Sequence, residues 1–197
     1  MDAGIILAGG QSRRFGRDKC AALFEGRPLI TWAYEVLAGC TPVAVSARSN
    51  TKAFIFARAH SLDVVRDEAC DPVGPLAGIR AGLRWAHSRG AMLLASVPCD
   101  MPLLPRNLIA RLMLARGAAF ASVAATPEGA QPLCAVWHVA LPGRFDIAMR
   151  EQCHPVVHDF LRAIDAVEVD FPEVAHFKNI NFQSDLDKVA KDRLPCL

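Results

Sequence analysis

Short apolar runs alternate with helix-like segments throughout the first half of the chain, and this alternation constrains the fold more than any other feature. Apolar runs of this kind are typical of strands that are buried on both faces of a sheet. The expected strands are residues 3–7, 43–46, 62–66 and 91–97, and the expected helices between them are residues 29–38, 50–60 and 74–85. The pattern predicts βαβ units, and therefore an α/β fold with a Rossmann-like, mostly parallel sheet flanked by helices.

The second half of the chain departs from this rhythm. Residues 121–125 and 133–137 are strand-like, and the turn-forming residues 126–129 between them predict a small antiparallel extension. A helix, a strand and a closing helix are then expected at residues 155–164, 166–170 and 184–191, with Ser184 and Asp187 at the spacing of a capping box. We expect one domain over residues 1–197, because a chain of this length suits one hydrophobic core better than two independent ones.

Composition excludes several functional classes. The formal net charge is +2 and no run of five or more basic residues occurs, so we expect binding neither to nucleic acid nor to a membrane surface. The apolar run at residues 4–8 is far too short for a signal peptide or a membrane span. The seven cysteines are odd in number and scattered, with no CxxC pair, which favours a reduced, cytoplasmic location.

A glycine-rich, cationic loop follows the first expected strand. The segment LAGGQSRRFGRDK, residues 7–19, contains Gly9, Gly10, Arg14, Gly16 and Lys19. Glycines let the backbone adopt positive φ and bring N–H groups close to phosphate oxygens, while Arg14 and Lys19 supply the positive charge that a triphosphate requires. The loop is not a Walker A motif, since no Ser or Thr follows Lys19. It predicts a site for the phosphates of a nucleoside triphosphate.

A second candidate site lies at the end of the fourth expected strand, where the sequence reads PCDMP from Pro98 to Pro102. Ligands of open parallel sheets bind outside the carboxyl ends of the strands. Asp100, held between two prolines, is well placed there to bind a hard cation such as Mg²⁺. An Asp at this point can also cap the next helix, but the phosphate loop at the same edge favours the metal. We therefore predict a nucleotidyltransferase that uses Mg²⁺ on Asp100.

The motifs also occur together in a recognisable order. They are Leu7-Ala8-Gly9-Gly10, Arg14, Gly16, Lys19, Gly74-Pro75-Leu76-Ala77-Gly78, Pro98-Cys99-Asp100 and Asn179-Ile180-Asn181. From about residue 3 to residue 186 the chain resembles the molybdenum cofactor guanylyltransferase family, also called molybdopterin-guanine dinucleotide synthase. The loop and the PCD motif are shared by many nucleotidyltransferases, whereas LAGG, GPLAG and the late N-x-N indicate the guanylyl branch.

The resemblance implies transfer of GMP from GTP to molybdopterin carrying molybdenum, with release of pyrophosphate and with Mg²⁺ as cofactor. It implies nucleotide binding by Leu7, Ala8, Gly9, Gly10, Lys19, Ser46, Asp67, Gly74, Gly78 and Asp100. Catalysis is expected from Arg14, Lys19 and Asp100, metal binding from Asp100, and pterin-side contacts from Asn179 and Asn181. The nucleotide half would be about residues 1–105 and the pterin-side half about residues 106–197. We expect a monomer that meets other cofactor-biosynthesis proteins and apo-molybdoenzymes.

Other functions stay open at this point. Ser46 stands where the family often has an Asn, and its single hydroxyl cannot make a paired donor and acceptor contact with guanine. A molybdopterin cytidylyltransferase and a sugar-phosphate nucleotidyltransferase are the nearest alternatives, although cytidylyl relatives tend to carry LAAG and lack GPLAG. A non-catalytic nucleotide-binding protein that delivers the cofactor is a third, and the presence of both Lys19 and Asp100 argues against it.

Overall fold

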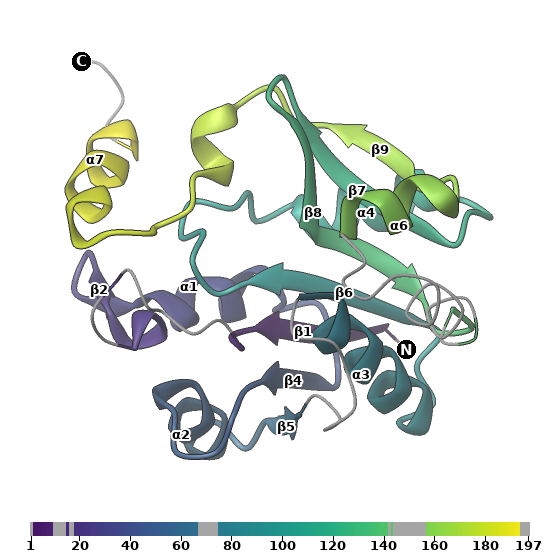
Figure 1. Ribbon diagram of the computed structural model, residues 1–197, viewed down its shortest axis with the longest axis horizontal. Coiled ribbons are helices and arrows are strands. Elements are labelled where there is room, and N and C mark those ends of the chain that lie inside the picture. Colours follow the sequence, from purple (N-terminus) through teal and green to yellow (C-terminus); the bar gives the residue numbers. More distant parts are fainter. Residues whose placement is uncertain are drawn as a thin grey trace.

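The computed structural model describes residues 2–9, 15, 18–66, 75–141, 143 and 157–193, and these form a seven-stranded sheet covered by helices (Figure 1). The strand order is β5-β4-β1-β6-β8-β7-β9. Strands pair in parallel except where β8 meets β6 and β7. The strands are β1 (Asp2–Leu7), β4 (Val43–Ser46), β5 (Asp63–Val65), β6 (Leu93–Pro98), β7 (Ala121–Thr126), β8 (Gly129–His138) and β9 (Val167–Asp170). The predicted fold class is confirmed, including the antiparallel extension.

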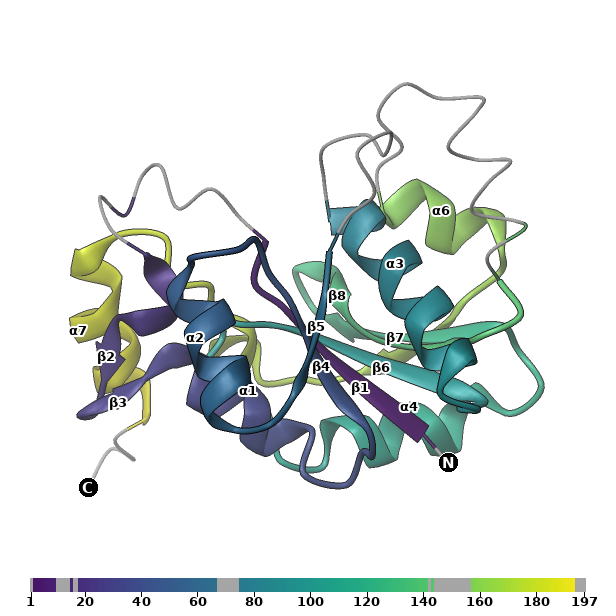
Figure 2. The same ribbon diagram turned by 90° about the horizontal axis from the view of Figure 1, so that it is seen from below.

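Helices cover both faces of the sheet, as the apolar strands require. Alternate side chains of β1 enter different cores: Ile6 packs with α1 and α2, and Ile5 packs with α3. Figure 2 shows the sheet nearly edge-on between these two layers. The helices are α1 (Leu29–Val36), α2 (Lys52–Ala59) and α4 (Leu108–Arg116) on one face, and α3 (Pro75–Ser88) and α6 (Val157–Ala163) on the other. Within the described residues, no helix combines the length and the apolar character that crossing a membrane needs.

The C-terminal helix α7 (Gln183–Arg193) closes a third, smaller core at one end of the molecule. There Ile180 and Leu186 pack with residues of a two-stranded hairpin, β2 (Leu23–Phe24) and β3 (Arg27–Pro28), and of α1. Both views show α7 beside this hairpin (Figures 1 and 2). This contact brings the end of the chain next to the short helix η1 (Lys19–Ala21), which directly precedes β2.

Three local features differ from the sequence prediction. The β2–β3 hairpin was not predicted, because its turn uses Glu25 at φ 49° with Gly26 at φ 75° rather than the usual Asn-Gly or Asp-Gly pair. Helix α4 was not assigned a range either. The capping box of Ser184 with Asp187 is wrong, because α7 begins one residue earlier and the carboxylate that caps it is Asp185, which accepts from the Phe182 N–H at 2.8 Å.

Close packing of α3 on the sheet depends on Gly82. A Cβ atom at this position would lie 2.7 Å from Cδ1 of Ile5 in β1 and 3.1 Å from Cδ2 of Leu94 in β6. We expect Gly82→Val to destabilise the protein by about 2 kcal/mol through overpacking, lowering Tm by about 4–8 °C in a thermal melt. His87→Val, at an exposed position of the same helix, is the matched control. Equal melting temperatures for the two variants would contradict this account of the interface.

Candidate functional site

The carboxyl ends of β1, β4 and β6 meet at one edge of the sheet. Leu7, the last residue of β1, lies in register with Ser46 of β4 on one side and with Pro98 of β6 on the other. Beyond the strands the backbones stay joined, because the Ala8 N–H donates to the Ser46 carbonyl at 3.1 Å and the Cys99 N–H to the Leu7 carbonyl at 3.3 Å. The start of the glycine loop and the PCD segment are therefore neighbours, as the sequence predicted from parallel pairing.

Gly9 continues from this edge beside the side chain of Ser46. Among the described atoms, a Cβ at Gly9 would meet only the Ser46 hydroxyl oxygen, at an ordinary contact distance of 3.8 Å. Packing against the described residues therefore does not explain this glycine. Ser46 itself is 4% exposed, so its hydroxyl lies beneath the edge rather than out in solvent.

The other predicted nucleotide residues divide into two groups. Gly78 lies buried in the first turn of α3, the helix that follows β5. The start of α3 is therefore on the same carboxyl-end side of the sheet, where helix N–H groups favour anions. The remaining predicted residues lie outside the described residues; they are Gly10, Arg14, Asp67 and Gly74.

Three predicted site residues from distant parts of the chain converge on one ammonium group. Lys19 Nζ donates to Asp100 Oδ2 at 2.7 Å and to Asn181 Oδ1 at 3.0 Å. The Lys19 and Asp100 side chains are 12% and 21% exposed, so the ion pair is partly shielded from water and its electrostatic interaction is stronger than at an open surface. The sequence analysis assigned Lys19 to the nucleotide and Asn181 to the pterin, and the structure brings the two into direct contact.

Lys19 is held by the local structure of η1. Asp18 caps this short helix, with Oδ1 accepting from the Cys20 N–H at 3.2 Å. Its other oxygen, Oδ2, accepts from the Lys52 N–H at the start of α2 at 2.7 Å. The Asp18 carboxylate thus links η1, which contains Lys19, to the start of α2. Sequence reasoning missed Asp18, although a polar residue directly before a short helix is a signal for a cap.

The two carboxylate oxygens of Asp100 have different surroundings. Oδ2 accepts from Lys19, whereas Oδ1 is buried and has no hydrogen-bond partner among the described residues. A buried oxygen without a partner is unfavourable unless something else satisfies it. A hard cation would do so, and an oxygen donor is the kind that Mg²⁺ prefers. Asp100 therefore fits a Mg²⁺ ligand.

Asp100 is not part of a metal site formed by protein side chains alone, as far as the described residues show. Within the described residues, no group of three or more His, Cys, Asp or Glu side chains is arranged to hold a metal ion. Mg²⁺ is commonly bound by one or two carboxylates together with substrate phosphates. The arrangement thus fits a metal that is shared between Asp100 and a bound nucleotide.

Asn179 and Asn181 line a cavity of about 460 Å³ next to this cluster. The same cavity is lined by the tip of the β7–β8 hairpin, at Glu128 and Gln131, and by side chains of α7. It is an open, polar space of a size suited to a small organic ligand. Both asparagines line this cavity, and Asn181 in addition accepts the hydrogen bond from Lys19.

Cys99, between Pro98 and Asp100, is not a nucleophile. Its Sγ lies 3.0 Å from Sγ of Cys20, and both thiols are buried. The hydrogen bond with Cys20, followed by burial, raises the pKa of the Cys99 thiol well above its ordinary value. Because only a thiolate attacks efficiently, this environment favours a packing role.

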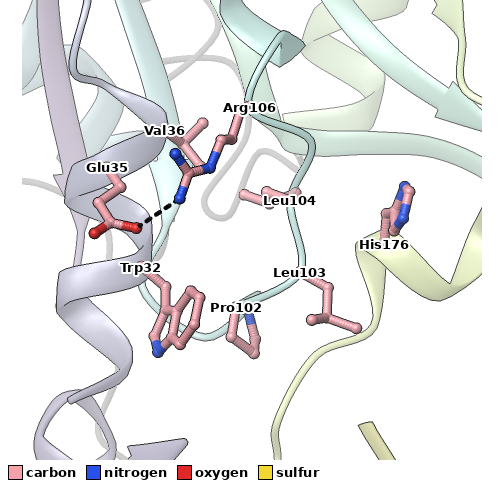
Figure 3. Close-up of a pocket in the computed structure, with 8 residues that line it drawn as sticks. All are labelled: Trp32, Glu35, Val36, Pro102, Leu103, Leu104, Arg106 and His176. Carbon is pink, nitrogen blue, oxygen red and sulfur yellow. Dashed lines mark ion pairs between the residues drawn. The ribbon is translucent and has the colours of Figure 1, made fainter. Parts of the chain in front are cut away.

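A second cavity, lined in part by the segment that follows Asp100, is a weaker candidate (Figure 3). It measures about 230 Å³ and is lined by Trp32, Glu35, Val36, Pro102, Leu103, Leu104, Arg106 and His176. Arg106 lies across from Glu35 of α1 at 3.7 Å, which partly neutralises both charges. Neither Lys19 nor Asp100, the two predicted catalytic residues that the structure describes, lines this cavity, so the Lys19–Asp100 cluster remains the better candidate.

Comparisons with known proteins show which family the chain resembles. A family model described as a MobA-like NTP transferase domain matches residues 4–164. The molybdenum cofactor guanylyltransferase of Cereibacter sphaeroides is 38% identical over 93% of this chain and 92% of its own length. That of Rhodobacter capsulatus is 37% identical over 98% of this chain and 96% of its own.

Solved structures share the fold. Molybdopterin-guanine dinucleotide biosynthesis protein A from Archaeoglobus fulgidus superposes with a TM-score of 0.74 at 21% identity, covering 98% of each chain. A 4-diphosphocytidyl-2C-methyl-D-erythritol synthase from Anaerococcus prevotii gives 0.73 at 12% identity, covering 98% of this chain and 95% of that one. At these identities the likeness concerns the fold alone.

Proposed function

The chain belongs to the MobA-like NTP transferase family, and we propose that it transfers GMP from GTP to molybdopterin carrying molybdenum, forming the guanine dinucleotide cofactor and releasing pyrophosphate. The relatives with 37–38% identity over nearly the whole chain are named molybdenum cofactor guanylyltransferases, which supports the choice of substrates. The observation that carries the proposal is the Lys19–Asp100 pair, set at the edge where the glycine loop leaves β1.

In the proposed reaction, the terminal phosphate of molybdopterin attacks the α-phosphorus of GTP and pyrophosphate leaves. Lys19 binds phosphate oxygens and offsets the charge that develops on the leaving group. Asp100 keeps Lys19 in place through Oδ2 and offers Oδ1 as a ligand to Mg²⁺. When bound, Mg²⁺ supplies further neutralisation of phosphate charge. Arg14 and the amides of the glycine loop are proposed to share this task; Arg14 lies outside the described residues.

We propose that the two substrates occupy neighbouring parts of one groove within a single domain. The nucleotide would contact the half of the chain up to about residue 105, at the ends of β1, β4 and β6. Molybdopterin would approach from the other half, where the cavity beside Asn179 offers amide groups and the ammonium group of Lys188. Cations of this kind suit the phosphate that molybdopterin carries. We further propose that the protein acts as a cytoplasmic monomer that meets other cofactor-biosynthesis proteins and apo-molybdoenzymes.

Base preference gives a direct test. With Mg²⁺ present, we expect GTP to raise Tm more than ATP, CTP or UTP at equal concentration, by about 5 °C or more near saturation. A site that hydrogen-bonds O6 and N2 of guanine leaves buried groups unpaired with the other bases. The measurement is a thermal shift titration, with each nucleotide repeated without Mg²⁺ as the control. A larger shift with CTP would instead support the cytidylyltransferase alternative.

A further inference from the structure

We propose that Asn181 is a positioning residue for the Lys19–Asp100 pair, through which the C-terminal segment controls how the nucleotide is bound. The inference rests on the proposed function only in taking Lys19 as a phosphate ligand. It differs from the role expected from the sequence, which placed Asn181 on the pterin side. The contact that carries it is the 3.0 Å hydrogen bond from Lys19 Nζ to Asn181 Oδ1, between residues 162 positions apart.

The segment before α7 contacts both members of the pair. Asn181 holds Lys19 through its side chain, and the neighbouring Ile180 N–H donates to the backbone carbonyl of Asp100 at 2.9 Å. Ile180 is fully buried in the core that α7 forms with the β2–β3 hairpin and α1. This buried anchor sets where Asn181 stands relative to Asp100. Two independent contacts therefore fix one short segment against the site.

Asp185 holds the backbone of Asn181. Its Oδ2 accepts from the Asn181 N–H at 2.9 Å and from the Phe182 N–H at 2.8 Å. The N–H of Phe182, followed by that of Asn181, lowers the pKa of the Asp185 carboxyl below its usual value. A lowered pKa means that the stabilising contact is fully present above the ordinary carboxyl pKa and is lost only as the pH falls through the lowered one. The capped segment is thus intact at neutral pH.

The geometry explains what Asn181 contributes. An ammonium group donates hydrogen bonds in several directions, and the contacts with Asp100 Oδ2 and Asn181 Oδ1 both restrict its orientation. Without the amide oxygen, the same ammonium is drawn more fully towards the Asp100 carboxylate by charge attraction. The ammonium would then lie less favourably for binding a phosphate. It would also compete more strongly with Mg²⁺ for the Asp100 carboxylate. We therefore expect the loss of Asn181 to weaken nucleotide binding about tenfold, within the range of a charge-assisted hydrogen bond.

A double-mutant cycle on Lys19 and Asn181 tests this directly. The dissociation constant of the Mg²⁺–nucleotide complex is measured by calorimetry for wild type, Lys19→Met, Asn181→Ala and the double variant. If Asn181 acts through Lys19, the double variant binds the nucleotide as weakly as Lys19→Met alone. Asn181→Leu keeps the side-chain bulk without an acceptor and should behave like Asn181→Ala. Because Asn181 is exposed, neither change disturbs the core, and circular dichroism checks the fold.

Ser184→Ala is the control, since Ser184 is an exposed polar residue in the adjoining first turn of α7 and lies outside the candidate site. It should leave the nucleotide dissociation constant unchanged. The proposal is overturned if the two single effects multiply in the double variant. It is also overturned if Asn181→Ala keeps wild-type nucleotide affinity, or tightens it, while only the requirement for molybdopterin rises.

The choice of nucleotide separates this proposal from the proposed function. The cycle is run with whichever nucleotide wild type binds most tightly in Mg²⁺. Tight binding of CTP in place of GTP would contradict guanylyl transfer, yet coupling between Lys19 and Asn181 on CTP would still support the positioning role. Independent effects on GTP would contradict the positioning role and leave guanylyl transfer standing.

Discussion

Replacing Asp100 with Asn is expected to lower kcat/KM for guanylyl transfer by at least about a hundredfold, because a lost metal contact at a reacting centre typically costs several kcal/mol. The amide is a poorer Mg²⁺ ligand at Oδ1, and it also removes the charge that holds Lys19 at 2.7 Å. The measurement is pyrophosphate release across a Mg²⁺ titration. The apparent Mg²⁺ requirement should rise together with the loss of turnover.

The matched control is Asp63→Asn. Asp63 lies in β5 and pairs with Arg89 at 2.6 Å and with Nε1 of Trp85 at 2.9 Å, so the same chemical change is made away from the candidate site. This control should keep its turnover and its Mg²⁺ dependence, whatever happens to its melting temperature. Near-native activity of Asp100→Asn at ordinary Mg²⁺ concentrations would mean that the metal is held elsewhere.

Replacing Lys19 with Met is expected to reduce GTP-dependent turnover by about ten- to a hundredfold or more, the range of a lost charge-assisted hydrogen bond to phosphate. Methionine keeps much of the length of the side chain, so the effect isolates the ammonium group. Lys19→Arg should restore only part of the activity, because a planar guanidinium does not reproduce the point charge between Asp100 and Asn181.

Steady-state kinetics with varied GTP measure the effect of Lys19→Met, and Lys52→Met is the control. Lys52 is an exposed lysine at the start of α2, so this change removes one positive charge without touching the pair. If both variants lose activity equally, the effect is one of general electrostatics. That result would remove Lys19 from its proposed role at the phosphates.

Sequence predicted well what local patterns determine. Short apolar runs determine β1, β4 and β6, because a strand buried on both faces has few alternatives. Parallel pairing then places their carboxyl ends at one edge, which is why residues at the start of the glycine loop and Asp100 could be predicted as neighbours. The family resemblance was likewise confirmed, over residues 4–164.

Contacts between distant segments could not be predicted in the same way. Nothing in the local pattern around Asn181 signals a hydrogen bond to a lysine 162 residues away. That contact depends on α7 packing against the β2–β3 hairpin, whose Glu-Gly turn gave a weak signal. The cap by Asp185 was missed for a related reason, since the exact start of a helix is decided by its tertiary neighbours.

The most direct test of the account follows the phosphates of GTP. Purified protein is incubated with Mg²⁺, molybdopterin carrying molybdenum, and GTP labelled at either the α- or the γ-phosphate. Attack on the α-phosphorus predicts that the α label appears in the cofactor product and the γ label in pyrophosphate. When CTP labelled at the α-phosphate replaces GTP, no label should appear in the cofactor product. Release of the γ label as inorganic phosphate, or an α label that never joins the pterin product, would contradict guanylyl transfer by this protein.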